Sequence, residues 1–183
     1  STLGRTLIRM YEPTDGILTY DGHDITKTKG KELLAYHKRM QIIFQDPYSA
    51  LDPHQNVREI MAEPISVFEK LSEKEMDERI VSLLEKVGMK ADDMEKYAYE
   101  FSGGQRQRIG IARALSVHPE FLLCDEPISA LDVSIQAQVV NVLEDLQQEL
   151  GLTYLFVAHD LSMVRHISHQ VGVMYLGNLI EYA

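Results

Sequence analysis

The sequence has one cysteine, Cys124, and no tryptophan among its 183 residues. A lone cysteine excludes an internal disulfide framework and fits a reducing compartment. The longest apolar runs, at 121–124 and 154–158, are far shorter than the roughly 20 residues that cross a bilayer as a helix. No charged-then-apolar leader follows Ser1, where the sequence opens. We therefore expect a soluble intracellular domain, and the length suits one domain with a sizeable core.

Basic residues are scarce in the last third of the chain. Residues 117–183 hold nine Asp or Glu and one base, Arg165, and the whole chain carries a formal net charge of −10. Proteins that hold duplex nucleic acid place Lys and Arg against its phosphates. The charge distribution therefore argues against nucleic acid as the main partner, and solubility alone accounts for most of the acidic excess.

Apolar strands alternate with helical segments in the second half of the sequence. We expect strands at 120–124 and 153–157, and between them an amphipathic helix that follows Asp132 and stops at Gly151. Further elements are expected at 1–9 (a helix with Leu3, Leu7 and Ile8 on one face), 17–20 (a strand ending in an Asp21-Gly22 hairpin turn), 31–39 (helix), 41–44 (strand), within 56–100 (helices), at 161–168 (helix), and at 171–175 and 179–182 (strands). Strands separated by helices predict an α/β fold whose parallel sheet is covered on both faces, with a helical insertion.

Two carboxylates, Asp125 and Glu126, directly follow the apolar strand at 121–124. In parallel α/β sheets the ligand crevice lies at the carboxyl ends of the strands. An Asp in that place can hold Mg²⁺ through water, and the next carboxylate can act as a general base on an attacking water. Taken alone, the pair is equally well explained as two acids that end a buried strand.

Ser102 and Gln105 have the spacing of a capping box, which predicts a helix N-terminus. Gly103 and Gly104 lie in the first turn, where glycine costs helix stability but lets backbone N–H groups approach a phosphate closely. A cap by itself does not need both glycines. We therefore favour anion binding over a purely structural cap.

Single polar residues follow two further strands. His159 comes just after the strand at 153–157, where it can donate a hydrogen bond to a phosphate or orient a water, although a lone His is more often a satisfied structural residue. Gln45 follows the strand at 41–44, and its amide can touch a metal-bound water or simply stabilise the turn. We expect His166 and His169 to be solvated, and the charged run at 73–79 to be the exposed face of a helix.

In this order, the segments resemble the nucleotide-binding subunit of an ABC transporter. Residues 101–105 look like the family signature, with Phe where Leu is commoner, and 122–126 look like the Walker B segment with its catalytic Glu. Residues 129–132 are similar to the D-loop, Gln45 to the Q-loop glutamine and His159 to the switch histidine. The sequences of residues 45–53 and of the run Phe-Ser-Gly-Gly-Gln-Arg-Gln-Arg look most like those of dipeptide and oligopeptide importers.

The resemblance implies a P-loop NTPase of RecA-like fold, with an incomplete core at 1–46 and 117–183 and a helical signature subdomain at 47–116. It implies ATP and Mg²⁺ as cofactors, and ATP hydrolysis that powers import of peptides or a similar solute through closure of an ATPase dimer. The implied partners are a second ABC ATPase subunit, membrane permease subunits and, indirectly, a solute-binding protein, at the cytoplasmic face of the membrane. The implied site residues are Glu126, His159 and Gln45 for catalysis; Ser1, Thr2, Ser102, Gly103, Gly104, Gln105 and Asp132 for the nucleotide; and Ser1, Gln45 and Asp125 for Mg²⁺.

One departure from the family pattern is large. The phosphate loop Gly-x-x-x-x-Gly-Lys-Ser/Thr is absent, and residues 1–5 look like the continuation just after its Lys. In such loops the backbone cradles the phosphates, the Lys neutralises them and the Ser/Thr binds Mg²⁺. The resemblance therefore implies a portion of a longer subunit, and we expect the 183 residues alone to bind ATP poorly and hydrolyse it negligibly.

Two other interpretations stay open. One is an ABC ATPase of DNA repair or translation. Repair types carry a long coiled coil between the Q-loop and the signature, whereas only 56 residues separate Gln45 from Ser102 in this sequence. Translation types join two such domains in one chain and need a basic face, which this sequence lacks. The other is a non-catalytic interaction fragment.

Overall fold

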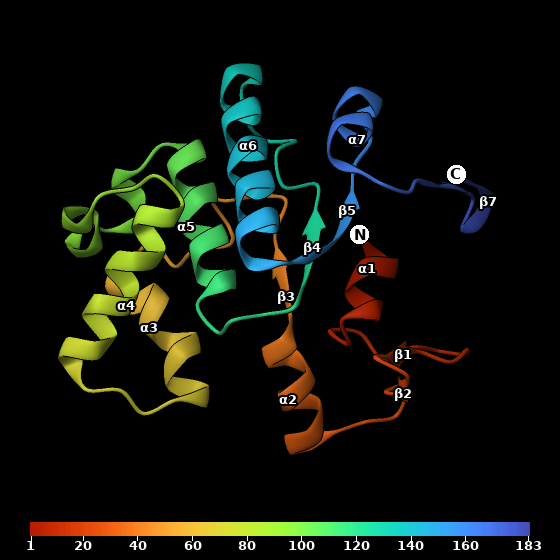
Figure 1. The fold of residues 1–183 in the computed structure, drawn as a ribbon, viewed down its shortest axis with the longest axis horizontal. Coiled ribbons are helices and arrows are strands. Elements are labelled where there is room, and N and C mark those ends of the chain that lie inside the picture. Colours follow the sequence, from red (N-terminus) through yellow and green to blue (C-terminus); the bar gives the residue numbers. More distant parts are fainter.

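The computed structural model describes residues 1–183 as seven α-helices, two short 3₁₀ helices and seven strands (Figure 1). In chain order these are α1 (Thr2–Leu7), β1 (Thr19–Tyr20), β2 (His23–Asp24), α2 (Gly30–Arg39), β3 (Met40–Ile43), α3 (Val57–Phe68), α4 (Glu73–Lys86), η1 (Ala91–Glu95), η2 (Ala98–Glu100), α5 (Gly103–Leu115), β4 (Phe121–Asp125), α6 (Val133–Leu150), β5 (Thr153–Val157), α7 (Leu161–Ile167), β6 (Gly172–Tyr175) and β7 (Asn178–Tyr182).

The central sheet has three parallel strands in the order β3-β4-β5, which confirms the expected α/β class. Ile43 pairs with Cys124, and Asp125 pairs with Val157, so the carboxyl ends of the three strands meet at one edge. The N-termini of α1, α5 and α6 lie toward the same edge (Figure 1). Chain direction alone thus brings the expected motifs to one end of the molecule.

Side-chain alternation along β4 buries both faces of the sheet. Leu122 and Cys124 belong to a core cluster of 28 buried residues, which also holds residues of α3, α4, α5 and α6. Leu123 points to the opposite face and packs in a smaller cluster with Ile8 and Met40. Since successive strand residues alternate between faces, Asp125 lies on the side of Leu123, which is the side that α1 covers.

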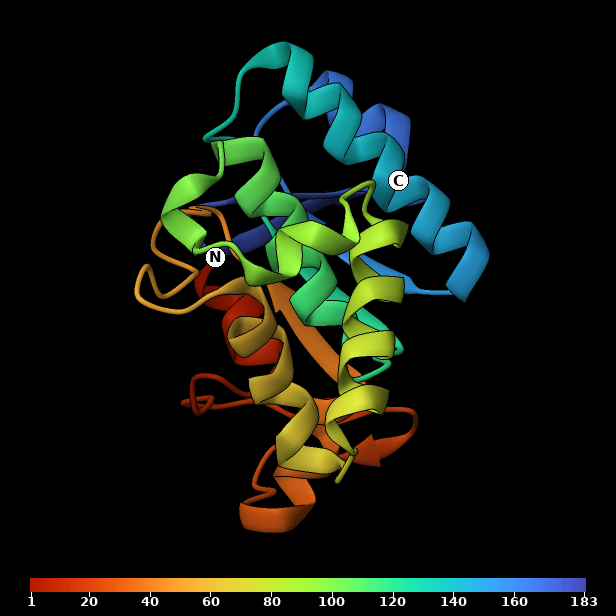
Figure 2. The same ribbon diagram turned by 90° about the vertical axis from the view of Figure 1, so that its left-hand side faces the viewer.

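Helices α3, α4 and α5 form the predicted helical region, and each begins at a capping box. The pairs are Asn56 with Glu59, Ser72 with Glu75, and Ser102 with Gln105. Each box satisfies two backbone N–H groups that a helix start leaves free. In the view from the side of the molecule where α3 and α4 lie, this region stands in front of the sheet (Figure 2). Because the 28-residue cluster runs through both parts, the proposed division at 47–116 stays a prediction.

The helical start of the chain is shorter than the sequence suggested. The helix ends at Leu7. Of the three residues expected on one face, only Ile8 is buried, and Leu3 is half exposed. Arg9 adopts a left-handed backbone with φ +60° and donates a hydrogen bond of 2.7 Å to the carbonyl of Ile25. A non-glycine residue in that conformation stops an α-helix, so α1 cannot continue to residue 9.

We expected the charged run at 73–79 to be the exposed face of a helix, but one of its residues, Arg79, is not exposed. Arg79 is mostly buried and bonds Glu69 at 2.5 Å and the carbonyl of Ser116 at 2.6 Å. Glu69 also pairs with Lys38 of α2 at 3.2 Å. Arg79 therefore ties α4 to neighbouring elements, because a buried guanidinium needs acceptors.

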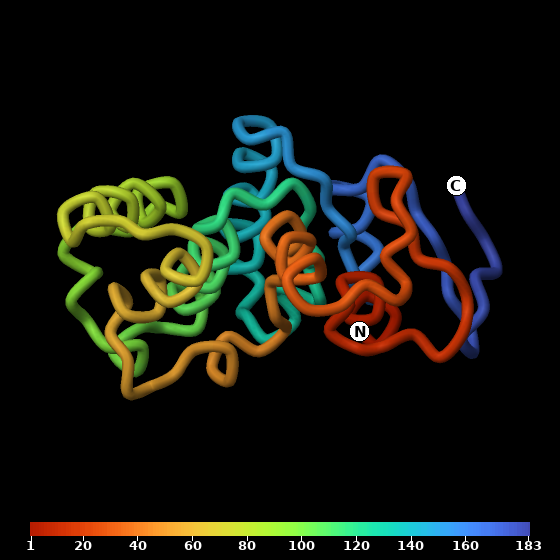
Figure 3. Tube along the Cα trace, turned by 90° about the horizontal axis from the view of Figure 1, so that it is seen from below, coloured from red at the N-terminus to blue at the C-terminus, as the bar shows by residue number.

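The hairpin β6–β7 lies apart from the central sheet and pairs only with itself. Its turn at Gly177 and the turn at Asp21-Gly22 between β1 and β2 agree with the sequence. A groove of about 660 Å³ separates the hairpin from β5 and α7. The hairpin and the helical region lie at opposite ends of the molecule (Figure 3). None of the helices combines the length and apolarity needed to cross a membrane.

Candidate functional site

Glu126 occupies a strained position directly after β4. Its φ of +50° lies in the left-handed region, which is unusual for a residue with a side chain. Its backbone N–H bonds the carbonyl of Val157 at 2.9 Å, and its own carbonyl accepts from the hydroxyl of Ser129 at 3.1 Å. These bonds hold the sharp turn, and strain of this kind concentrates at functional sites.

The carboxylate of Glu126 is contacted by the two other residues expected to act in catalysis. Gln45 donates from Nε2 to Oε2 of Glu126 at 3.1 Å, and Nδ1 of His159 lies 3.2 Å from the same oxygen. The three side chains come from the ends of β3, β4 and β5, which are adjacent in the sheet. The structure therefore brings together Gln45, Glu126 and His159.

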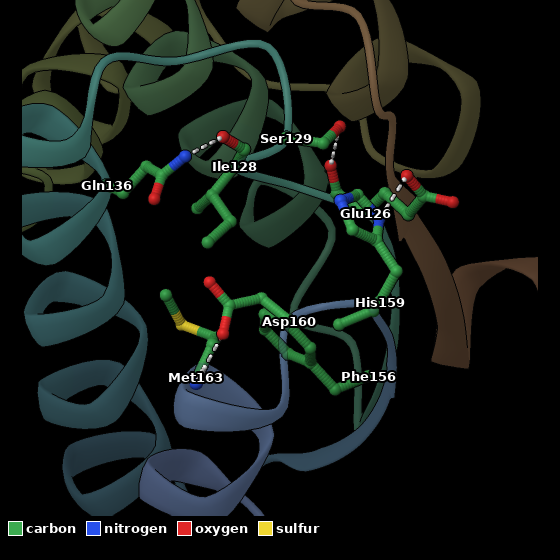
Figure 4. A pocket seen from close by; sticks show the side chains of 9 residues that line it. Glu126, Ile128, Ser129, Gln136, Phe156, His159, Asp160 and Met163 are labelled. Atoms are coloured by element: carbon green, nitrogen blue, oxygen red, sulfur yellow. Dashed lines mark hydrogen bonds and ion pairs between the residues drawn. The ribbon is translucent and has the colours of Figure 1, made fainter. Parts of the chain in front are cut away.

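A cavity of about 70 Å³ lies beside this group, lined by Glu126, His159 and residues of the β4–α6 loop and α7 (Figure 4). Asp160 also lines it, but its carboxylate accepts hydrogen bonds from Ser162 and from the N–H of Met163. These bonds, with the Ser162 hydroxyl first, lower the pKa of Asp160 below its ordinary value. Asp160 thus caps α7 and is not free to take part in chemistry.

Asp125 is fully buried and bonded on one side only. Arg5 donates from Nε and Nη2 to the same oxygen, Oδ2, at 3.1 and 3.0 Å. The other oxygen, Oδ1, has no hydrogen-bond partner, and the nitrogen of Ser1 lies 3.8 Å from it. Sequence reasoning missed Arg5. Its place one helical turn after Ser1 puts the two residues on the same face of a helix, but carries no sign of the contact with Asp125.

The signature segment at the start of α5 forms the predicted cap. Oγ of Ser102 accepts from the N–H of Gln105 at 3.4 Å, and Oε1 of Gln105 accepts from the N–H of Ser102 at 3.0 Å. A Cβ atom at Gly104 would overlap Cγ2 of Ile135 in α6. Close packing against Ile135 therefore accounts for Gly104, and our argument for anion binding, which rested on a cap not needing both glycines, was incomplete.

Tyr48, in the loop after Gln45, packs against the same helix start. The guanidinium of Arg106 lies 4.4 Å from the centre of its ring, and its hydroxyl would lie 3.2 Å from a Cβ atom at Gly103. Gly103 is thus also fitted to a neighbour, though less tightly than Gly104.

Two polar side chains of α5 hold the segment that carries Gln45. Gln107 is buried and donates to the carbonyl of Phe44 at 3.3 Å, and Arg113 donates to the carbonyl of Ala50 at 2.7 Å. Burial lowers the pKa of Arg113. The signature helix is therefore physically connected to both sides of Gln45.

The side chains of the two remaining predicted site residues, Asp132 and Thr2, make no hydrogen bonds in the structure. Asp132 is exposed at the N-cap of α6 and its side chain makes no capping bond, while Thr2 only offers its carbonyl to the Thr6 hydroxyl. No group of three His, Cys, Asp or Glu is arranged to hold a metal, and His166 instead lies 3.3 Å from Glu144. The roles assigned to these residues stay predictions.

Comparison with known proteins places this chain in a family. The family model described as "ABC transporter" matches residues 1–129, so the chain belongs to the ABC transporter family. The chain is 55% identical over 185 residues to the oligopeptide transport ATP-binding protein OppF of Bacillus subtilis, and 51% identical over 182 residues to AppF of the same organism, which carries the same description. The alignments cover 100% and 99% of this chain but 61% and 55% of those relatives, so the chain spans little more than half of their length.

The fold agrees with solved members of the family. A dimeric ATP-binding cassette, MJ0796, in a post-hydrolysis state bound to ADP and Pi, superposes with a TM-score of 0.87 over 100% of this chain and 78% of its own. Its sequence identity is 24%, so this likeness supports the ABC ATPase fold alone.

Proposed function

We propose that this chain is a portion, carrying the catalytic glutamate, of an ATP-hydrolysing subunit that powers import of peptides through a membrane transporter. The observation that carries the proposal is the carboxylate of Glu126, held by Gln45 and His159 at the carboxyl edge of the parallel sheet. The oligopeptide transport relatives support peptides as the cargo. The permease subunits, the solute-binding protein and a position on the cytoplasmic face of the membrane belong to this same proposal.

In this proposal Glu126 polarises the attacking water. Its backbone is held by Val157 and Ser129, and its carboxylate is held by Gln45 and His159, so the carboxylate loses little freedom during the reaction. His159 is mostly exposed and reaches the γ-phosphate of ATP from the end of β5. Gln45 orients the carboxylate from the side of β3.

The residues present fit a magnesium ion. Oδ1 of Asp125 is a buried acceptor without a donor, and such an atom is costly unless a ligand satisfies it. The start of α1 at Ser1 lies beside it, and Ser, Asp and Gln oxygens are ligands that Mg²⁺ accepts. When bound, Mg²⁺ neutralises phosphate charge. Asp125, Ser1 and Gln45 would hold it, with Thr2 next to the phosphates.

A second ATPase subunit completes the site in this proposal. Ser102, Gly103, Gly104 and Gln105 lie at a helix N-terminus, which favours anions because its N–H groups and dipole carry partial positive charge. This helix start contacts the γ-phosphate held by the partner subunit, while Asp132 joins the two sites. ATP then closes the dimer because both subunits bind it, and hydrolysis releases them. Residues 47–116 form the subdomain that carries the signature.

Light scattering on the full-length subunit with Glu126→Gln, with and without Mg-ATP, tests the proposal. A mass that doubles only with ATP supports the composite site. A companion Gly103→Asp variant should not double, because its carboxylate would repel the phosphate. A monomer that binds ATP would indicate an unlike partner ATPase, and loss of ATP binding by the unmutated subunit would overturn the proposal. The 183 residues alone, which lack the glycine-rich phosphate loop and its Lys, should hydrolyse ATP negligibly.

A further inference from the structure

The two oxygens of the Asp125 carboxylate have unequal surroundings. Nε and Nη2 of Arg5 both donate to Oδ2. Oδ1 is left without a donor, although the Asp125 side chain is fully buried. We propose that Arg5 is a positioning residue, which fixes the orientation of Asp125 so that Oδ1 faces a divalent cation bound with the nucleotide beside Ser1. This inference rests on the proposed function, since it concerns the same cation.

A second arginine–carboxylate pair at the other end of β4 shows what a closed pair looks like. Arg39 donates to both oxygens of Glu120, with Nε 3.0 Å from each and Nη2 2.7 Å from Oε2. A purely structural pair gains most when the guanidinium engages both oxygens. The Arg5–Asp125 pair forgoes that gain in a buried place, where an unmade bond costs more.

The backbone explains why Arg5 is suited to this task. Ser1 and Arg5 lie one turn apart, linked by the hydrogen bond from the N–H of Arg5 to the carbonyl of Ser1 at 3.0 Å. A Cβ atom at Gly4, between them, would come within 2.7 Å of Leu123, so α1 lies tightly against β4. The helix therefore delivers a guanidinium to Oδ2, while Oδ1, on the side of Ser1, is left without a hydrogen-bond donor.

A role in orientation predicts a specific energetic signature. Hydrogen-bond partners of metal-binding side chains contribute about 10- to 100-fold to metal affinity by fixing the ligand's orientation. The positive charge of Arg5 opposes a nearby cation, so an arginine that merely neutralised Asp125 would weaken cation binding. The sign of the effect of removing Arg5 thus separates positioning from competition.

The test uses the full-length subunit with ATP and Mn²⁺ as the probe, and measures free Mn²⁺ by electron paramagnetic resonance. Arg5→Met should weaken Mn²⁺ binding in the presence of ATP about 10- to 100-fold, and leave ATP binding without metal within about twofold. The matched control is Arg39→Met, which removes an arginine from the closed pair at the opposite end of the strand and should leave both affinities unchanged.

Two further variants keep the test decisive. Arg5→Lys retains the charge but offers a point donor, so it should fold and bind Mn²⁺ with intermediate affinity. Arg5→Met added to Asp125→Asn should cause no further loss, because Arg5 acts only through that carboxylate. Native or tighter Mn²⁺ affinity in Arg5→Lys and Arg5→Met overturns the inference. Failure of the unmutated subunit to bind ATP and Mn²⁺ would instead overturn the proposed function.

Discussion

Nδ1 of His159 and Oε2 of Glu126 lie 3.2 Å apart, although the two residues come from the ends of different strands. The same oxygen accepts the amide of Gln45 at 3.1 Å. Three strand ends thus converge on one carboxylate oxygen, and the left-handed turn at Glu126 is what aims that oxygen between its neighbours.

Replacement of Glu126 by Gln in the full-length subunit should abolish most ATP hydrolysis. The amide keeps the size of the side chain but cannot take a proton, and a general base contributes about 10²- to 10⁴-fold to a rate. Phosphate release under single-turnover conditions measures the change, and ATP binding should persist. Hydrolysis at the native rate in this variant would remove Glu126 from the catalytic role.

Gly104→Ala should destabilise the protein, whereas Gly110→Ala in the same helix should not. The added methyl group at residue 104 overlaps Ile135, and such overpacking costs about 1–3 kcal/mol. At residue 110 the space is open, so alanine should stabilise the helix by roughly 0.5–1 kcal/mol. Urea unfolding of the full-length subunit compares the two, and equal effects would contradict the packing argument.

The ion pairs of Glu69 should make stability fall in acid. Hydrogen bonds from Arg79 first and Lys38 second lower the pKa of Glu69 below its ordinary value of 4.5. A group whose pKa is lower in the folded state adds stability above 4.5, and this stability is lost as the pH falls through the folded value. Glu69→Gln should therefore be less stable at neutral pH and should lose less stability on acidification. The exposed Glu78→Gln is the control, and parallel pH profiles for all three proteins would refute the assignment.

The thiol of Cys124 should resist modification in the native protein. It is fully buried in β4, and burial raises its pKa well above the ordinary value of 9.0, so little thiolate is present. A chromogenic disulfide reagent should react with it only as the protein unfolds, at a rate that follows denaturant concentration. Fast reaction without denaturant would show that the core opens readily at this strand.

Much of the fold was predictable because it depends on local signals. The period of apolar residues and the glycine at 151 marked the helix α6, which ends there in a left-handed Gly151, and apolar runs marked β4 and β5. The end of α1 was not predictable, since the conformation of Arg9 accompanies its bond to Ile25, far along the chain.

The candidate site divided in the same way. Gln45, Glu126 and His159 could be placed together because parallel strands end at one edge of a sheet. Arg5 could not be assigned to Asp125, since 120 residues separate them and either residue has other plausible partners. The contact of Gly104 with Ile135 was equally invisible, because a glycine shows what a site permits but not which neighbour requires it.

The bonds from Gln107 to Phe44 and from Arg113 to Ala50 make α5 more than a support for the signature. A displacement of this helix would carry along the backbone on both sides of Gln45, and with it the amide that touches Glu126. The geometry around the Glu126 carboxylate is thereby tied to the position of a helix whose N-cap residue, Ser102, is exposed. In the proposed dimer, a second subunit that moves the start of this helix would change the geometry around Glu126 without touching it.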